Sequence, residues 1–179
     1  MKSRILSGGI RHFVVFICFL TLGSQAFART EYEIKAAYLY NFIKFVSWGD
    51  ESALDKDFLN VCILGKDPFQ ELIDPIEGKS IQGRSIRLIK SESYTGPMNC
   101  NVVFFSSSDE RAVRSLLDKP EFENALTVSD MEDFAKSGGM IGFVHVGNVI
   151  RFEINLSKAR QSGVAISSKL LELALEVYQ

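Results

Sequence analysis

Arg151, Glu153 and Asn155 are the residues whose types and spacing look most like a reactive site. Side chains two positions apart in a strand point to the same face, so a guanidinium, a carboxylate and an amide should lie together. Such a trio could bind a substrate or transfer protons. The alternatives are an ion pair between Arg151 and Glu153 that fixes the strand, or a contact surface for a partner. No catalytic motif surrounds the three residues, which favours the alternatives.

Other catalytic chemistry finds little support. His145 would have to serve as the base of a Ser/His/Asp hydrolase, but the sequence lacks the G-x-S-x-G elbow that presents a nucleophilic serine. His145 with Cys62 and Cys100 does not make an ordinary zinc site, and no calcium-loop spacing occurs. Ser106–Ser108 suit an anion at a helix start, or plain helix capping. The glycines at 65 and 138–139 suit turns better than a nucleotide loop. We therefore expect no enzyme, no metal and no cofactor.

The N-terminus has the three parts of a secretory signal peptide. Lys2, Arg4 and Arg11 form a basic start, Phe13–Leu22 is a short apolar core, and Ala26-Phe27-Ala28 provides the small-x-small cleavage pattern. We expect residues 1–28 to be removed after Ala28, which leaves 29–179 as one exported domain. An uncleaved membrane anchor is the alternative, although the apolar run is short for a bilayer.

Charge and cysteine content narrow the class further. The whole chain carries a net charge of −2, and loss of the basic N-terminus would make it more acidic. Without a basic block, a nucleic-acid partner is not expected. Cys62 and Cys100 are the cysteines left after cleavage, and an even pair in an exported protein favours a disulfide. Two buried free thiols are the alternative.

The mature chain should begin with a helix from Glu31 to about Val46, because Thr30 and Glu33 have capping-box spacing. The helix carries two apolar stripes where a surface helix needs one. Either it is buried on both sides, or one side meets another protein. Trp48, of a type enriched at interfaces, supports a contact or a homodimer. The candidate contact residues here are Leu39, Tyr40, Ile43 and Trp48.

The rest of the chain alternates strands with helices. Strands are expected at 58–64, 86–89, 102–105 and 126–128, with helices at 68–73, 110–117 and 130–136. Gly147-Asn148 then forms a hairpin turn that pairs Val146 with Val149 and Phe143 with Phe152. A helix capped by Asn155 or Ser157 follows, and a last helix runs from Ser167 or Ser168 through Val177. This pattern predicts one α/β domain: a mainly parallel mixed sheet with a C-terminal antiparallel hairpin and helices on both faces.

Six sequence blocks together resemble the YfiR family, also called the DUF4154 domain. They span nearly all of the mature chain in the expected order. The blocks are KAAYLYNF followed by KFV and Trp48, VCILGKDPF at 61–69, LTVSD at 126–130, GGMI at 138–141, VIRFEINL at 149–156 and SSKLL at 167–171.

The resemblance implies a periplasmic α/β regulator that binds proteins and tends to dimerise. The family's namesake holds a membrane diguanylate cyclase inactive through its periplasmic sensor part, and an outer-membrane lipoprotein can sequester it. Cys62 and Cys100 match one family disulfide, whereas a second, more C-terminal disulfide has no counterpart here. Arg151, Glu153 and Asn155 belong to the family's RFEIN signature.

The expected function is therefore a periplasmic repressor in cyclic di-GMP signalling, with a membrane sensor protein as partner. The alternative is a small-solute-binding protein, or a sensor accessory protein for another membrane receptor. Such a solute would bind at the carboxyl edge of the sheet.

Overall fold

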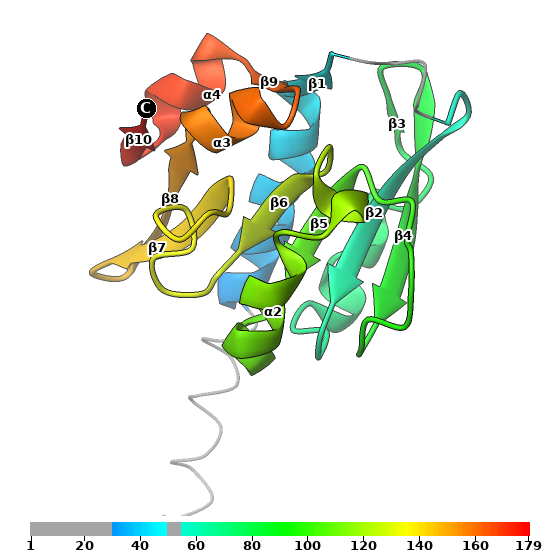
Figure 1. Ribbon diagram of the computed structural model, residues 1–179, viewed down its shortest axis with the longest axis horizontal. Helices are drawn as coiled ribbons and strands as arrows, with labels where there is room; N and C mark the ends of the chain where they lie inside the picture. Colours follow the sequence, from blue (N-terminus) through cyan, green and yellow to red (C-terminus); the bar gives the residue numbers. More distant parts are fainter. Residues whose placement is uncertain (1–29, 50–54) are drawn as a thin grey trace, which may run out of the picture.

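The computed structural model describes residues 30–49 and 55–179, so the predicted signal peptide and its cleavage site lie outside the described residues. An eight-stranded sheet has the order β10-β8-β7-β6-β5-β2-β4-β3 (Figure 1). All neighbouring pairs are parallel except β3 with β4 and β7 with β8. A separate antiparallel pair joins β1 and β9. The predicted mixed α/β fold with a C-terminal hairpin is confirmed.

The strands and helices have the following bounds. The strands are β1 (Val46–Trp48), β2 (Phe58–Leu64), β3 (Ser80–Ile81), β4 (Arg84–Ser91), β5 (Val102–Phe105), β6 (Leu126–Ser129), β7 (Ile141–Val146), β8 (Val149–Asn155), β9 (Val164–Ile166) and β10 (Glu176–Tyr178). The helices are a first helix at residues 30–44, α2 (Glu110–Leu116), α3 (Leu156–Gln161) and α4 (Ser168–Leu173).

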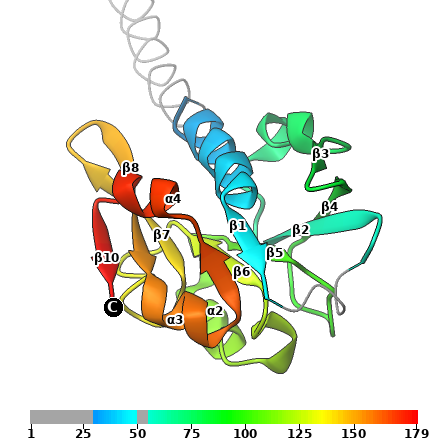
Figure 2. The same ribbon diagram turned by 90° about the horizontal axis from the view of Figure 1, so that it is seen from above.

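Two apolar cores lie on opposite faces of the sheet because its central strands carry apolar side chains on both faces. In β2, Val61 and Ile63 face a core shared with the first helix, α3 and α4. Cys62 and Leu64 face a second core shared with α2. All four side chains are at most 3% exposed. The helices therefore cover both faces, as the continuous apolar strands predicted (Figures 1 and 2).

Burial of the first helix accounts for its two apolar stripes. Leu39, Phe42 and Ile43 are fully buried, and the Phe42 ring packs 4.9 Å from that of Phe152. The helix ends at residue 44, not at Val46 as predicted. Val46–Trp48 instead forms β1 against β9, a strand that the sequence analysis missed. A tertiary partner has overridden the local helical pattern here.

Three other predicted helices differ from the structure. Residues 68–73 form 3₁₀ turns, and 130–136 form a run of turns, because Gln70 and Asp133 take positive φ angles of 52° and 53°. Asp67 still caps the first of these segments, through Phe69 N at 2.8 Å. The last helix ends at Leu173, and β10 follows it where more helix was predicted.

The hairpin has the register that its sequence predicted. Val146 pairs with Val149, and Phe143 pairs with Phe152. Gly147 takes a φ of +60°, which glycine adopts without strain. Just before the hairpin, a Cβ atom at Gly139 would lie 2.1 Å from the Phe134 ring, so only glycine fits there.

Cys62 and Cys100 form the expected disulfide, with their Cα atoms 5.9 Å apart. The bond ties β2 to the segment that leads into β5, across a sequence separation of 38 residues. Constraining a loop of that size in the unfolded chain should stabilise the fold by about 3–4 kcal/mol.

We predict that replacing both cysteines by serine lowers the free energy of unfolding by about 3–4 kcal/mol in urea denaturation. Reduction by dithiothreitol should lower the stability of the wild type but leave the double variant unchanged. Equal stability of oxidised and reduced wild type would contradict a stabilising role for the bond.

Candidate functional site

A buried ion-pair cluster fixes the start of the first helix to the sheet. Lys35 is 2% exposed, and its Nζ lies 2.7 Å from Asp130 Oδ2, just beyond the carboxyl end of β6. The same Nζ lies 2.5 Å from Glu31 Oε1, one helical turn earlier. Lys35 and Asp130 belong to two of the sequence blocks noted above, but the sequence analysis did not pair them.

Tyr32 completes this cluster. Its hydroxyl donates to Asp130 Oδ2 at 2.8 Å, and its ring lies 4.3 Å from Lys35 Nζ. Burial, and then the Asp130 carboxylate, raise the pKa of Tyr32, so the phenol stays a neutral donor across the physiological range. Asp130 thus accepts from both a cation and a hydroxyl, which offsets the cost of burying its charge.

The cluster reaches the hairpin through Glu31. His145 Nε2, near the tip of β7, lies 3.2 Å from Glu31 Oε1. The predicted position of His145 near the turn is confirmed. Its ring is half exposed and contacts a glutamate of the first helix. This contact brings the hairpin next to the helix start.

The RFEIN residues do not form the ion pair that their spacing suggested. Within the described chain, no ion pair joins Arg151 to Glu153. Arg151 donates instead to the Leu173 carbonyl of α4 at 3.3 Å. Glu153 is 8% exposed and lies beside Tyr178, where burial and then the Glu153 carboxylate raise the tyrosine pKa. The predicted pairing is therefore wrong, and the two side chains secure the C-terminal segment separately.

Asn155 has a structural role. Its Oδ1 accepts from Lys158 N at 2.8 Å and caps α3, and its Nδ2 donates to the Ala135 carbonyl at 2.8 Å. Asn155 is therefore the cap, where the sequence left Asn155 and Ser157 open. Its partners are all within the chain's own backbone, so of the three RFEIN residues Arg151 is the one with an exposed neighbourhood.

Most of the contact residues predicted on and after the first helix are buried. Leu39 and Ile43 are fully buried, and Trp48 is 5% exposed. They pack in the chain's own core, so a partner could reach them only if that core opened. Tyr40 is half-buried, with the ammonium of Lys79 4.7 Å from its ring. The two stripes and Trp48 therefore no longer argue for a homodimer.

Five large apolar side chains of the described chain are exposed, and four of them lie on the hairpin or around the end of α4. Val146 and Val149 are 47% and 58% exposed and face each other across the hairpin. Leu173, whose carbonyl accepts from Arg151, is 59% exposed, and Leu175 follows it. Ile34 lies one turn from Glu31, the partner of His145. These five residues are the exposed large hydrophobics of the described chain, and we call them the apolar end.

A free strand edge adjoins the apolar end. β10 pairs only with Glu153–Asn155 of β8, and Leu175 N extends the contact to the Phe152 carbonyl at 2.8 Å. In the described part of the chain, no strand covers Val149–Arg151 on that side. An edge of this kind offers backbone hydrogen bonds to another chain.

The carboxyl edge of the sheet holds a cavity of about 260 Å³ beside α2, where the solute-binding alternative expected one. Ser106 and Ser108 line it, but Ser106 makes no capping bond and Ser108 Oγ accepts from Lys66 N at 3.3 Å. A larger cavity, of about 510 Å³, lies at the opposite, amino edge.

Residues 30–49 and 55–179 contain no group of three His, Cys, Asp or Glu side chains placed to hold a metal ion. Within the same residues, no helix has the length and hydrophobicity of a membrane span.

The fold places the chain among three-layer α/β domains. It belongs to the family described as DUF4154, YfiR/HmsC-like, whose model matches residues 32–175. At the level of the family, these are periplasmic regulators in cyclic di-GMP signalling that act with membrane sensor proteins. No curated protein matches the sequence.

Among solved structures, the chain is similar to the ABC domain in complex with L-Trp from Streptococcus pneumonia. The two share 10% sequence identity with a TM-score of 0.47, and the match covers 66% of this chain and 55% of that one. The chain thus spans about half the length of that structure, and likeness at this level carries no functional argument.

We predict that Lys35→Met lowers the free energy of unfolding by about 3–5 kcal/mol, because it leaves Asp130 buried without its cation. The same substitution at Lys136 breaks the exposed pair with Asp133 and should leave the free energy of unfolding nearly unchanged. Urea denaturation of the two variants measures both. Equal losses would show that the buried pair does not anchor the helix.

Proposed function

We propose that this protein is a periplasmic repressor that binds the periplasmic sensor part of a membrane diguanylate cyclase and holds that cyclase inactive. The match of the family model to residues 32–175 carries the proposal. In this reading residues 1–28 direct export and are removed after Ala28, and 29–179 form the single regulatory domain. The domain acts by binding and catalyses no reaction.

We assign the partner contact to the apolar end. Interfaces bury exposed apolar side chains at their centre, and an arginine among them is typical. Val149 and Leu173 flank Arg151 in this way, since Arg151 contacts the Leu173 carbonyl and lies two positions along the same strand face from Val149. The free edge of β8 at Val149–Arg151 lies in the same region and could add backbone hydrogen bonds from a strand of the partner.

The buried cluster is linked to the hairpin that carries part of this surface. Lys35 holds the first helix on the sheet, and Glu31 of that helix meets His145 of the hairpin. The helix start and the hairpin thus keep a fixed relation, so a partner meets an ordered surface and pays little to order it. Tight binding to the inactive cyclase then represses it only if the active form binds less well.

Two further partners follow from the same reading. An outer-membrane lipoprotein would relieve repression by covering the surface that the cyclase uses. A second copy of the chain would use the β8 edge to form a homodimer. Either partner would compete with the cyclase for the apolar end.

Deleting the gene should raise intracellular cyclic di-GMP, and returning the wild-type gene should bring the concentration back to its original low level. We predict that Val149→Lys restores it at least tenfold less effectively at equal periplasmic abundance, because a lysine desolvated in an apolar interface is costly. Thr95→Lys is the matched control, since it adds the same charge to an exposed loop after β4.

A deletion that leaves cyclic di-GMP unchanged would detach the protein from cyclase control. Full complementation by Val149→Lys would leave the regulatory function standing but move the contact away from the apolar end. Loss of complementation by Thr95→Lys as well would trace the effect to charge or abundance and not to this surface.

A further inference from the structure

The connections of the parallel strands change face between β2 and β5. In the order β4-β2-β5-β6, the strand that comes first in the chain lies between the second and the third (Figure 1). The chain leaves β2 on the face of the first helix, where Phe69 and Ile73 join the core beneath that helix. It leaves β5 on the opposite face, through α2, where Val113 joins the second core. Neighbouring strands whose connections leave on opposite faces form a crevice outside their carboxyl ends, and open α/β sheets bind ligands in such crevices.

The carboxyl-edge cavity of about 260 Å³ lies in this crevice. Leu64 and Gly65, at the end of β2, line it. Phe105 and Ser106, at the end of β5, line it from the neighbouring strand. An apolar protein cavity of about 150 Å³ can take benzene, so this one has room for a ligand of about ten non-hydrogen atoms. Its position is therefore that of a ligand site, and its size selects a small ligand.

Glycine at position 65 keeps the crevice open. Gly65 has a φ of +95°, in the region that favours glycine. A Cβ atom there would lie 3.0 Å from Ser106 Cβ and 3.1 Å from Ser108 Oγ, on two serines of the cavity wall. Gly65 N donates to the Ser91 carbonyl at 3.0 Å. Ser106 N donates to the Leu64 carbonyl at 2.8 Å. The backbone around the crevice is therefore held in place by the chain itself.

The wall of this cavity combines apolar side chains with one buried hydroxyl that is free for a ligand. Three serines that follow β5 line it. Ser108 Oγ accepts from Lys66 N at 3.3 Å. Ser115 Oγ donates to the Ala112 carbonyl at 2.7 Å. Ser106 is 5% exposed, and its Oγ has no hydrogen-bond partner in the described chain. The apolar side chains of the wall are those of Leu64, Tyr94, Phe105, Ala112, Val113 and Leu116.

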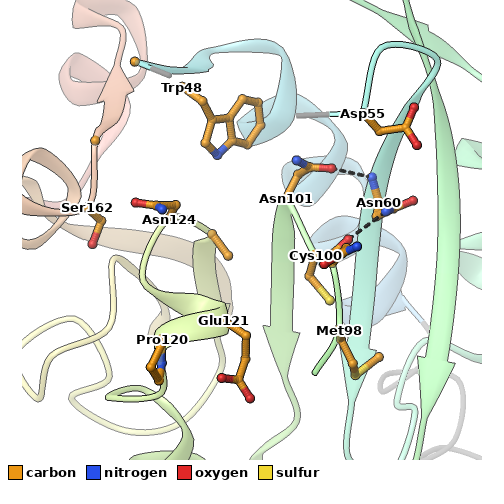
Figure 3. Close-up of a pocket in the computed structure, with 14 residues that line it drawn as sticks. Trp48, Asp55, Asn60, Met98, Cys100, Asn101, Pro120, Glu121, Asn124 and Ser162 are labelled. Carbon is orange, nitrogen blue, oxygen red and sulfur yellow. Dashed lines mark hydrogen bonds between the residues drawn. The ribbon is translucent and has the colours of Figure 1, made fainter. Parts of the chain in front are cut away.

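The unpaired polar atoms near the amino-edge cavity are not open to a ligand in this way. Trp48 and Asn60 belong to the wall of that cavity (Figure 3). However, Trp48 Nε1 and Asn60 Oδ1 are enclosed by the protein and have essentially no accessible surface. Ser106 Oγ is not enclosed in this way. The carboxyl edge therefore has the unpaired group that a bound molecule can reach.

The charge of the carboxyl-edge cavity selects against anions. Glu92, an exposed residue that follows β4, lines the cavity, and among the described residues no lysine, arginine or histidine does. An anion would meet this carboxylate without a cation to offset the repulsion, and an apolar wall does not replace the water that a charged group loses. The ligand should therefore be uncharged.

We propose that the carboxyl-edge cavity binds a small uncharged molecule that has an apolar body and one hydroxyl or carbonyl group. The body packs against Leu64, Phe105 and Val113, and the polar group forms a hydrogen bond with Ser106 Oγ. A hydroxyl and a carbonyl both fit, because a serine hydroxyl can donate as well as accept. The site shares no residue with the apolar end, so its test does not depend on the proposed cyclase contact.

Titration of the purified exported protein with cyclohexanol and with cyclohexanone tests the site. In ¹H–¹⁵N spectra, the backbone amide resonances of Gly65 and Ser106 should shift with either probe and reach saturation. Cyclohexanecarboxylate, an anion with the same ring, should leave both resonances in place. Absence of a saturable shift with both neutral probes, or an equal response to the carboxylate, would overturn the proposal.

The same titrations on three variants locate the ligand. Ala112→Leu fills the cavity from an exposed position of its wall and should weaken binding of both neutral probes about tenfold or more. Arg111→Leu adds the same side chain at the neighbouring exposed position of α2, outside the wall, and should bind like the wild type. Ser106→Ala removes the free hydroxyl and should weaken binding about fivefold.

Unchanged affinity of folded Ala112→Leu, or equal losses in Ala112→Leu and Arg111→Leu, would overturn the assigned location. Unchanged affinity of Ser106→Ala would overturn the assigned hydrogen bond.

Discussion

The buried contact between Lys35 and Asp130 is the constraint on which the functional end of the molecule depends. It joins residues 95 positions apart and places a charge pair in the interior, next to an apolar core. Such a pair is costly to break because either partner alone would be an uncompensated buried charge. The first helix is therefore held over the carboxyl end of β6 with a fixed rotation, and its inner stripe fills the core beneath it. Glu31 transmits this placement to the hairpin through His145.

The surfaces at the carboxyl and amino ends of the parallel strands differ in their side chains. At the carboxyl ends, the ion-pair cluster and the hairpin support a surface of exposed apolar side chains around Arg151. At the amino ends, a disulfide and asparagine side chains shape a cavity. We regard the first as a surface for a protein partner. β1 and β9 connect the regions physically, since the first helix runs directly into β1 and Trp48 ends it.

The local sequence pattern was enough to predict the elements whose conformation depends mainly on nearby residues. The apolar run at 58–64 gave β2 with its bounds, and Gly147-Asn148 gave the hairpin register. The predictions that failed concern elements whose conformation depends on distant parts of the chain. β1 and β10 exist because β9 and β8 offer them edges, so their sequences read as helix ends. The role of Trp48 and of the two apolar stripes could not be decided from the sequence, because burial on both sides and contact with a partner produce the same apolar pattern. Arg151 and Glu153 share a strand face as predicted, but α4 and Tyr178 draw them to different partners.

The central claim is that the apolar end contacts a membrane cyclase, and site-specific photocrosslinking in living cells tests it most directly. A photoreactive residue placed at Val149 should crosslink to a membrane protein that has diguanylate cyclase activity, whereas the same residue at Thr95 should not. Membranes from cells that lack the chain should then show higher activity of that cyclase. Crosslinks from Val149 only to a second copy of the chain, or identical products from both positions, would contradict the account.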